Sequence, residues 1–391
     1  MRILQVHNSY QRRGGEDTVV AAEAALLRQN GHHVEQLIVS NDQIIGFRQK
    51  LSAALSVTYS TSSRDWLKAK VGSARPEIVH FHNLFPLLTP SVYDACWDAG
   101  VPVVQTLHNY RLGCINGMLA RNGAICEKCW IGSPLWGVLY RCYRSSALGS
   151  AAAALALAHQ HAKKTYQTKV TRFIALTEFA KRKFVDLGLP EHRIVVKPNF
   201  VADSEEDLPK AEARHGALFV GRLSEEKGVS ELVEAWREID YPLTIVGEGP
   251  LKCNMQAISP QHIRYTGFLS SDEVRRMMRK SAFLVFPSRW YEGLPMVIVE
   301  AFACGLPVLG SALGGVAELL ATGEGGWLVR PGSTSELRRL VQDILASPDD
   351  MNGKRLSAHR LFERELSSTV NYHQLISIYA DARAEFENAR N

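Results

Sequence analysis

Short runs of β-branched and other apolar residues alternate along the chain with stretches whose apolar positions recur at helical spacing. In the first half, the runs predict strands at 3–6, 33–39, 77–82, 103–107 and 173–176, with a helix at 19–30. In the second half, they predict strands at 217–220, 243–246, 264–266, 284–286, 308–310 and 326–329, with a helix near 229–239. Strands that alternate with helices are typical of parallel sheets, so we expect two doubly wound α/β domains facing each other across a cleft.

A polar stretch at 202–213, rich in Asp, Glu and Lys, interrupts this periodicity and is typical of an interdomain linker. We therefore assign 1–200 to an N-terminal domain and 201–365 to a C-terminal domain. A final amphipathic pattern at 370–386 predicts a helix that packs back on the first domain, so that 366–391 would complete it.

Composition narrows the class of protein. The 391 residues are 46% hydrophobic, enough for two ordinary cores. The net charge of +5, from 45 basic and 40 acidic residues, is too mild to indicate a nucleic-acid partner. The chain begins with a strand pattern instead of a leader, and its longest apolar stretch, 147–158, is shorter than the roughly 20 residues that span a bilayer. We expect a cytoplasmic protein, at most attached to a membrane surface.

The segment 289–305 carries the strongest chemical signal. Pro295 suits a first helical turn and Gly305 a C-terminal cap, which predicts a helix from about 295 to 304. Glu300 then lies among apolar residues, where a carboxylate is costly without a strong partner. A ribose diol would supply two donors, and the amides at the helix N-terminus would suit a diphosphate. An ion pair of Glu300 with a core cation, and a solvated loop position for Glu292, remain equally open from either residue alone.

Glu292 and Glu300 stand seven residues apart in a Gly-Leu-Pro frame. In this the sequence resembles the retaining glycosyltransferases of family four, which have two Rossmann-like domains (the GT-B fold) and an E-x7-E signature. The resemblance extends over essentially the whole chain. It implies that Glu300 binds the nucleotide ribose, that Glu292 lies by the hydroxyls of the donor sugar, and that the amides of Gly293, Leu294 and Met296 reach the diphosphate.

A second motif, Gly-Arg-Leu-x-x-x-Lys-Gly at 221–228, follows the first strand of the second half. The resemblance implies that Arg222 and Lys227 contact the diphosphate. Two fixed cations can stabilise the charge that grows on the β-phosphate, so no catalytic metal is expected. A merely solvated basic pair is disfavoured, because cations at a helix start oppose its dipole. The strand ends at Gly247 and Phe268 resemble base-binding loops, although Gly-rich strand ends are common in any α/β domain.

The first half offers weaker signals. Gly14 and Gly15 follow the first strand and let a ligand approach the backbone, but the full G-x-G-x-x-G pattern of a nicotinamide dehydrogenase is missing. The resemblance implies that this loop faces the donor phosphates and that His108 lies close to the transferred sugar. His82 ends the preceding strand and is expected to be a neutral ring satisfied by a backbone carbonyl. Thr177 either matches a family motif or only caps a helix.

Four of the seven cysteines lie within one short insert at 114–142. They are Cys114, Cys126, Cys129 and Cys142. Cys-x-x-Cys spacing and a reducing compartment favour a structural zinc over a disulfide framework, with reduced, buried thiols as the alternative. The other three cysteines are taken as packing residues.

Basic residues and two histidines flank the Ala-rich stretch 147–158. Such an arrangement can meet anionic lipid headgroups, which predicts a possible peripheral membrane contact. Helix packing in the core is the favoured interpretation of the alanines, because the stretch lacks large anchors such as Trp or Phe.

The function implied by the resemblance is transfer of a sugar, with retention, from a UDP- or GDP-linked donor to a glycan or lipid-linked acceptor in polysaccharide biosynthesis. The hypothetical mechanism is front-face displacement without a protein nucleophile. A sugar-nucleotide 2-epimerase on the same scaffold is the first alternative, which the spacing of Glu292 and Glu300 disfavours. An inactive, zinc-stapled scaffold protein is the second, which the intact Arg222 and Lys227 disfavour.

Overall fold

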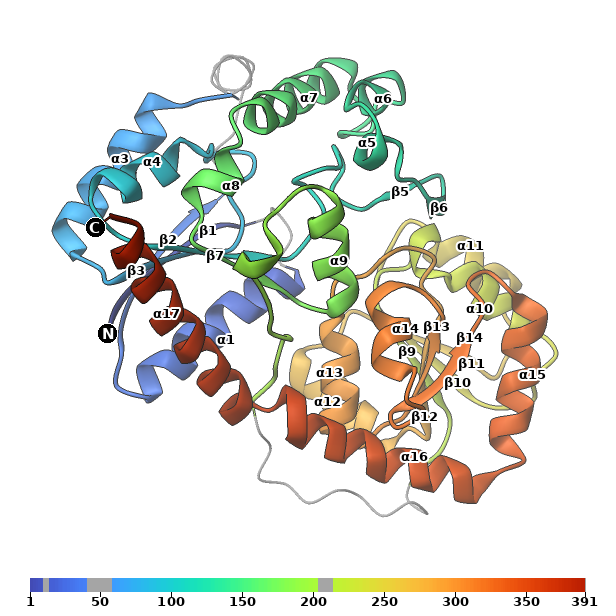
Figure 1. Cartoon of the computed structure of the whole chain (residues 1–391). Helices are drawn as coiled ribbons and strands as arrows, with labels where there is room; N and C mark the ends of the chain where they lie inside the picture. The colour runs from blue at the N-terminus through green and yellow to red at the C-terminus, as the bar shows by residue number, and fades with distance from the viewer. Residues whose placement is uncertain (10–13, 41–57, 203–213, 391) are drawn as a thin grey trace. The chain divides into compact units, whose positions relative to one another are not determined.

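The computed structural model of the chain describes residues 1–9, 14–40, 58–202 and 214–390. These residues divide into two compact units (Figure 1). The first contains 1–119, 126–198 and 371–391, and the second contains 120–125 and 199–370. The predicted linker at 202–213 lies outside the described residues except for its first position.

The first unit is built on a six-stranded parallel sheet in the order β2-β1-β3-β4-β7-β8. Its strands are β1 (Arg2–Ser9), β2 (His33–Ser40), β3 (Ile78–Phe81), β4 (Val103–Leu107), β7 (Arg172–Ala175) and β8 (Ile194–Val196). The direction of strand addition reverses between β1 and β3, which is where open α/β sheets place their ligand sites. The loops after these two strands, and after β4 beside them, are therefore the ones to examine.

Helices cover this sheet. They are α1 (Gly15–Gln29), α3 (Thr61–Ala74), α4 (Ser91–Asp98), α8 (Thr165–Lys169), α9 (Glu178–Asp186) and the C-terminal α17 (Ser368–Arg390). The predicted return of the C-terminal helix to the first unit is confirmed, because Leu375, Ile378 and Tyr379 of α17 lie in one core cluster with Ile3 and Ala24. Thr177 caps α9, its hydroxyl accepting the Ala180 amide hydrogen at 3.1 Å.

The cysteine-containing insert separates β4 from β7. It contains the hairpin β5 (Ala120–Arg121) and β6 (Ala124–Ile125) and the helices α5 (Lys128–Ile131) and α6 (Leu135–Leu139), and helix α7 (Ala147–Ala162) follows it. Helix α5 packs on α6, and α6 packs on α7. The sequence assigns the hairpin to the first domain, whereas its contacts place it in the second unit.

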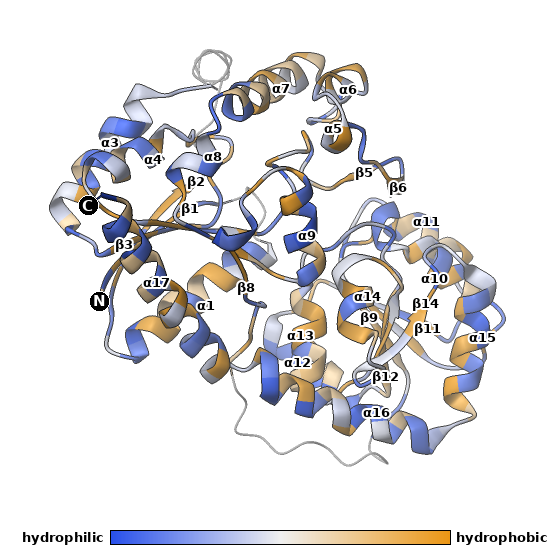
Figure 2. Ribbon diagram, viewed as in Figure 1, coloured by the Kyte–Doolittle hydropathy of each residue, from blue (hydrophilic) through white to orange (hydrophobic). Residues whose placement is uncertain are grey.

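The second unit has a six-stranded parallel sheet in the order β11-β10-β9-β12-β13-β14. Its strands are β9 (Ala217–Val220), β10 (Leu243–Val246), β11 (Ile263–Gly267), β12 (Phe283–Phe286), β13 (Val308–Ser311) and β14 (Gly326–Val329). Strand addition reverses between β9 and β12, so the loops after these strands meet at the switch point. Figure 2 shows the strands at the centre of both units as hydrophobic, as expected for sheets covered on both faces.

The helices of the second unit are α10 (Val229–Trp236), α11 (Lys252–Ile258), α12 (Ser271–Lys280), α13 (Met296–Ala303), α14 (Gly314–Leu320), α15 (Thr334–Leu345) and α16 (Pro348–Leu361). The predicted strands agree with the observed ones to within one residue, except that β1 continues three residues beyond its predicted end. Strands β5, β6 and β8 were not predicted. Helix α10 is shorter than predicted. Its last predicted residue, Ile239, is buried like the helix core but sits in a turn, with its amide bonded to the Trp236 carbonyl. No helix among the described residues is long and apolar enough to cross a bilayer.

Candidate functional site

The carboxylate of Glu292 is the centre of a polar cluster at the switch point of the second unit. Its Oε1 accepts hydrogen bonds from Lys227 Nζ at 2.6 Å, Ser288 Oγ at 2.8 Å and Trp290 Nε1 at 2.5 Å. The Lys227 ammonium also lies 5.2 Å from the centre of the Trp290 ring. Glu292 is only 9% exposed, so a charge there requires these partners. The structure thus brings together Glu292 and Lys227, two residues that the sequence motifs predict for one site.

Gly228 allows the loops after β9 and β12 to approach one another. It has a φ of 70°, in the left-handed region, and a Cβ at this position would lie 2.0 Å from the carbonyl oxygen of Pro287. The Arg289 amide also donates to the Glu226 carbonyl at 2.8 Å across the same pair of loops. The glycine after Lys227 is therefore required by close backbone packing, and it sets how near Lys227 comes to the loop after β12.

Helix α13 begins at Met296, one residue after its predicted start, with Pro295 as its N-cap instead of in its first turn and with no side-chain cap. Its first amides are therefore not bonded to a capping side chain. Asn199 Nδ2 donates a hydrogen bond to the Leu294 carbonyl at 3.0 Å and so fixes the loop that precedes the helix. An uncapped helix N-terminus fixed in this way can bind a phosphate group through backbone amides.

Glu300 lies one turn into α13 and is partly buried. Burial raises its pKa to about 7, against a weaker opposing effect of the Arg275 guanidinium. No hydrogen bond or ion pair satisfies its carboxylate among the residues that the structure describes, so the alternative of a core ion pair is not realised. Glu300 instead borders a small cavity that is also lined by Ser271, Arg275 and Arg279. A carboxylate without partners at a cavity wall is suited to hydroxyl donors from a ligand.

The loops after β9, β10 and β11 are packed through glycines. Gly247 has a φ of 137°, its amide donates to the Gly267 carbonyl at 2.8 Å, and a Cβ there would lie 2.0 Å from the Gly221 carbonyl oxygen. Gly247 is thus explained by packing alone. Phe268 is different, since it directly follows β11 and has 82% of its surface exposed. Next to Gly221, Arg222 is also exposed.

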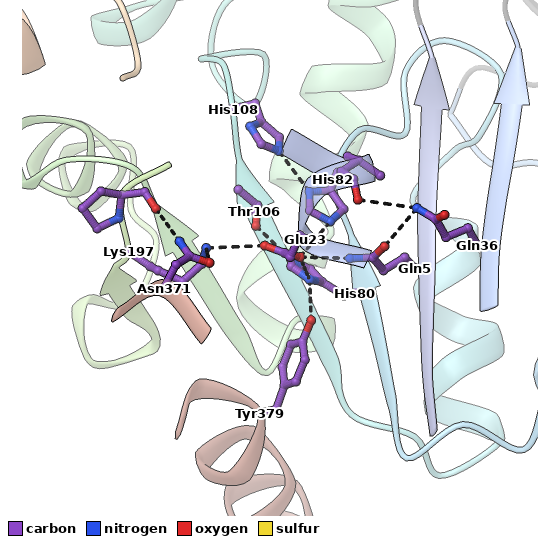
Figure 3. Close-up of polar contacts among 12 residues, drawn as sticks. Gln5, Glu23, Gln36, His80, His82, Thr106, His108, Lys197, Asn371 and Tyr379 are labelled. Atoms are coloured by element: carbon purple, nitrogen blue, oxygen red, sulfur yellow. Dashed lines mark hydrogen bonds and ion pairs between the residues drawn. The ribbon is translucent and has the colours of Figure 1, made fainter. Parts of the chain in front are cut away.

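The first unit contains a buried polar network that the sequence did not predict (Figure 3). Glu23 of α1 is 1% exposed. Its Oε1 accepts from Gln5 Nε2 at 3.0 Å and lies 3.1 Å from Nδ1 of His80, while Lys197 Nζ lies 3.4 Å from Oε2. Burial alone would raise the pKa of Glu23, but His80 and Lys197 outweigh it and hold that pKa well below its ordinary value. Glu23 is therefore a buried anion, and Lys197 beside it supplies the balancing cation.

This network extends to His108 through His82. Nε2 of His82 lies 3.4 Å from Glu23 Oε1, which is long for a hydrogen bond but close enough to orient the ring. On the other side of the same ring, Nδ1 of His82 lies 3.0 Å from His108 Nε2. Burial lowers the pKa of His82 to about 3 and that of His108 well below its ordinary value, so both rings are neutral. If His82 directs its N–H toward Glu23, its Nδ1 must accept, and His108 must then carry its proton on Nε2. The contact of His82 is a histidine, where the sequence predicted a backbone carbonyl.

The C-terminal helix contributes to the same network. Asn371 Oδ1 accepts from Lys197 Nζ at 3.2 Å, and the Tyr379 hydroxyl lies 2.8 Å from His80 Nδ1. On its other side, His80 Nε2 lies 2.8 Å from the hydroxyl of Thr106. Within the described ranges, Glu23, His80 and His82 are the one set of three or more such side chains with ligand atoms close enough for a metal ion. Lys197 already supplies a cation to this carboxylate, and both nitrogens of His80 have protein partners, so the set is better explained as a hydrogen-bonded network.

A cavity of about 860 Å³, including its open mouth, lies beside His108 in the first unit. Its wall is largely apolar and comes from the loops after β3 and β4, from the insert and from α7. Polar groups are His82, Asn83, Gln105, His108, Asn109 and Arg111, and small or apolar groups include Phe85, Leu112, Ile115, Ala153, Ala156 and Leu157. An apolar cavity with a few polar groups at one end is the usual form of a small-molecule site.

The loop after β1 is described only from Gly14 onward. The Gly14 amide donates to Asp17 Oδ2 at 2.8 Å, and Gly15 begins α1. Asn109, which follows β4, donates to Glu16 Oε1 at 3.0 Å. The loop after β4 is thus bonded to the first turn of α1, and the Gly14 amide already has an acceptor within the chain.

The cysteines of the insert are all reduced. Burial raises the pKa of Cys129 to about 11, with Cys114 and Cys142 adding to the effect and the backbone amides of Gly137 and Ile115 opposing it. Three of the four thiols therefore lie within electrostatic range of one another. They do not form a set with ligand atoms as close as those of the Glu23 network. Zinc binding by the insert stays a prediction.

Several residues of both clusters were missed by sequence reasoning. Ser288 and Trp290 complete the surroundings of Glu292, and Glu23 and Lys197 anchor the buried network. One signal was available for the first unit, because His80 of β3 and His82 just after it are two residues apart, a spacing that places both side chains on one face of an extended strand. Nothing in the local pattern indicates that a glutamate of α1 and a lysine more than 170 positions later meet them.

Comparison with known proteins gives two family matches. The model described as Glycosyltransferase Family 4 matches residues 3–205, more than half of the chain. The model described as Glycosyl transferases group 1 matches residues 201–358. The two matches meet close to the boundary between the two units.

Curated relatives are similar over part of their length. An uncharacterized glycosyltransferase of Methanocaldococcus jannaschii is 30% identical over 50% of this chain and 57% of its own. The amylovoran biosynthesis glycosyltransferase AmsK of Erwinia amylovora is 26% identical over 52% of this chain and 55% of its own. The chain thus spans about half the length of the curated relatives it matches.

Solved structures share the fold over nearly the whole chain. Anabaena HepE in complex with UDP has a TM-score of 0.69 at 16% identity, with 97% of this chain and 100% of that chain covered. A sucrose-phosphate synthase from Thermosynechococcus elongatus has a TM-score of 0.71 at 15% identity, with 98% and 100% covered. The predicted pair of doubly wound domains is confirmed by these neighbours and by the two parallel sheets.

Proposed function

Because the chain belongs to glycosyltransferase family 4, we propose that it transfers a sugar from a nucleoside diphosphate to a glycan or lipid-linked acceptor. The name of the Erwinia amylovora relative, an amylovoran biosynthesis glycosyltransferase, supports a role in polysaccharide assembly. Anabaena HepE has been solved with UDP and with UDP-glucose, which supports UDP over GDP as the leaving group.

The observation that carries this proposal is the cluster of Lys227, Ser288 and Trp290 around Glu292 at the switch point of the second sheet. A carboxylate held by three donors is rigid, so it can accept hydrogen bonds from sugar hydroxyls at a defined position. The ammonium of Lys227 beside it supplies a positive charge for a phosphate. An ordinary exposed ion pair is neither buried nor bonded to further donors, whereas Glu292 is both.

The donor is assigned to the second unit residue by residue. Glu300 accepts the two ribose hydroxyls, and the amides of Gly293, Leu294 and Met296 bind the diphosphate together with the cations of Arg222 and Lys227. The exposed ring of Phe268 stacks on the base beside Gly247.

The reaction that fits these roles is a front-face displacement with retention. The bond between the anomeric carbon and the β-phosphate oxygen breaks as the acceptor oxygen bonds to the same face of that carbon. The acceptor proton passes to the departing phosphate oxygen, so that sugar, proton and nucleoside diphosphate all balance. Arg222, Lys227 and the α13 amides stabilise the charge on the leaving group, so a catalytic metal is not required.

The cavity beside His108 is proposed as the acceptor site. Polar groups at the ends of β3 and β4, among them His108 and Asn109, line this cavity and suit the hydroxyls of a sugar. The apolar wall formed by Phe85, Leu112 and Ile115 suits a lipid-linked acceptor better than a fully hydrated glycan.

The test is acceptor-dependent release of nucleoside diphosphate by the purified chain, offered UDP- and GDP-sugars with lipid-linked and free glycan acceptors. We expect Glu292→Gln and Arg222→Ala to lower kcat by about a hundredfold or more, as for loss of one charge-stabilising donor. Arg264→Ala, another exposed arginine of the second unit, is the matched control and should leave turnover unchanged. Near-normal transfer by both site variants would overturn the assignment.

The same assay separates the alternatives. An epimerase would convert or release its nucleotide sugar without any acceptor, and an inactive scaffold would release none. The two relatives described above are both named as glycosyltransferases, which supports neither alternative.

A further inference from the structure

One face of α7 is both apolar and exposed. Leu148, Ala151, Leu155, Ala158 and Ala162 recur at alternating intervals of three and four residues, which aligns them along one side of a helix, and all five are exposed. Leu148 has 85% of its surface exposed. An ordinary surface helix presents polar residues to water, so this face is built for an apolar environment.

The large anchors that the sequence of α7 lacks are supplied by the two helices that precede it. Ile131 ends α5 with 80% of its surface exposed, and Leu135 and Leu139 of α6 are exposed one helical turn apart. Helix α5 packs on α6 and α6 packs on α7, so the three helices lie side by side (Figure 2), and each of them exposes large apolar side chains. The docking surface is defined here as these three helices and the turns between them, residues 128–164.

Aromatic and basic groups of this surface are arranged as at a membrane interface. Trp136 is exposed and stacks on Tyr140, and Lys128 Nζ lies 4.9 Å from the centre of the Trp136 ring and 2.9 Å from the Tyr140 hydroxyl. Trp and Tyr with a neighbouring Lys are preferred at the level of lipid headgroups, because one end of each ring is apolar and the other is polar.

The charge of the docking surface has one sign. Between Glu127 and Glu178 the sequence contains no Asp or Glu. The basic residues of the surface are Lys128, Arg141, Arg144, Lys163 and Lys164, and all five are exposed. The chain as a whole carries 40 acidic residues against 45 basic ones, so this segment departs sharply from the average. A surface that is apolar at its centre, basic at its edges and free of acids is complementary to an anionic bilayer.

We propose that residues 128–164 dock the protein on an anionic lipid bilayer. The exposed side chains of α5, α6 and α7 enter the acyl boundary, and the basic residues contact the headgroups. The other side of α7 lines the cavity beside His108 through Ala153, Ala156 and Leu157. Docking would therefore hold that cavity against the membrane surface, where a lipid-linked molecule would reach it. The lipid binding itself does not rest on the proposed transferase activity.

A flotation assay tests this with the full chain and two kinds of vesicle, pure phosphatidylcholine and a mixture of phosphatidylcholine with phosphatidylglycerol. We expect binding to the anionic vesicles to be at least tenfold stronger, and to weaken as salt is raised. Leu135→Ser/Leu139→Ser and Leu148→Ser/Leu155→Ser should each reduce it by tenfold or more, because each removes two large apolar contacts. Arg141→Glu/Arg144→Glu should abolish the preference for anionic lipid.

Matched controls keep the test specific. Ile258→Ser and Arg264→Glu/Arg276→Glu change exposed residues of the second unit and should bind vesicles like the unaltered chain. Thermal melting checks that every variant is folded, which we expect because all the changed side chains are exposed. Absence of binding to anionic vesicles, or equal loss in the controls, would overturn the proposal. A concentration-dependent dimer in light scattering that the Leu variants dissociate would also overturn it, since a second copy would then cover the surface.

Discussion

Glu300 is expected to destabilise the protein when no donor is bound, so that replacing its carboxylate should raise the free energy of unfolding. Burial raises the pKa of Glu300 from an ordinary 4.5 to about 7. A carboxyl pKa that is raised in the folded state does not lower stability at a pH below the pKa of the unfolded chain. As the pH rises above that value, the loss of unfolding free energy grows until the folded group is ionised. At about 1.36 kcal/mol for each pH unit, the cost above pH 7 would reach about 3.4 kcal/mol. Because Glu300 keeps part of its surface in water, we discount this to about 1–2 kcal/mol.

The perturbation is Glu300→Gln, which keeps the shape and removes the charge. Without donor, we expect the variant to gain about 1 kcal/mol of unfolding free energy over the unaltered chain between pH 5.5 and pH 8.5. Denaturant titrations of both proteins at the two pH values measure this difference, and groups common to both proteins cancel. Glu234→Gln, an exposed carboxylate of the same unit, should show no such gain.

Binding of UDP should reverse the order of the two proteins. Two ribose hydroxyls that donate to a carboxylate favour its ionised form, so Glu300 should release about half a proton on binding at pH 7. Calorimetry in two buffers of different ionisation enthalpy measures this release. Glu300→Gln should abolish it and weaken UDP by about 10- to 100-fold, as for loss of a hydrogen bond to a charged group. Proton release that persists in the variant would refute the assignment of the ribose to Glu300.

Three further predictions follow from the same structure. Burial lowers the pKa values of His82 and His108 well below those of an unfolded chain, so acid favours unfolding. As the pH falls from 7.5 to 5.5, each histidine should subtract about 1 kcal/mol of unfolding free energy. His82→Gln should remove the contribution of His82, as measured by thermal melting over a series of pH values. Gly228→Ala places a Cβ 2.0 Å from the Pro287 oxygen, so we expect about 3 kcal/mol or more of destabilisation by denaturant titration, and equal stability would show that the loops can move apart. Elemental analysis should find one zinc per chain, which Cys129→Ser should lose and Cys253→Ser should keep; less than half an equivalent in the unaltered chain would exclude the zinc site.

Much of α13 and its surroundings could be predicted from local sequence. The position of α13, from Pro295 to the turn at Gly305, follows from residues that begin and end helices regardless of their surroundings. The presence of Glu300 among apolar residues is also a local fact, and its raised pKa is a consequence of that burial. What local sequence could not predict is that Ser288 and Trp290 share the carboxylate of Glu292 with Lys227.

The buried network of the first unit could not be predicted, because its residues are not neighbours in the sequence. Glu23, His80 and Lys197 belong to a helix, a strand and a strand end that are distant in the sequence, and each is unremarkable alone. Their meeting depends on the order of strands in the sheet and on the return of α17 to it. The docking surface could not be predicted either. The alanine-rich sequence of α7 favours a helix packed in the core, and only the structure shows that one of its faces is exposed.

The sequence by itself determined the class of fold, the positions of most strands, the pairing of Glu292 with Glu300 at a fixed spacing, and the absence of acidic residues between Glu127 and Glu178. These depend on periodicity, helix boundaries and counting, which are properties of neighbours along the chain. Tertiary structure alone decided which charges are paired, which histidine faces which, and which apolar face meets water. The reason is physical: hydrogen bonding, desolvation and exposure depend on which groups approach within a few ångströms, and folding brings together residues from distant parts of the chain.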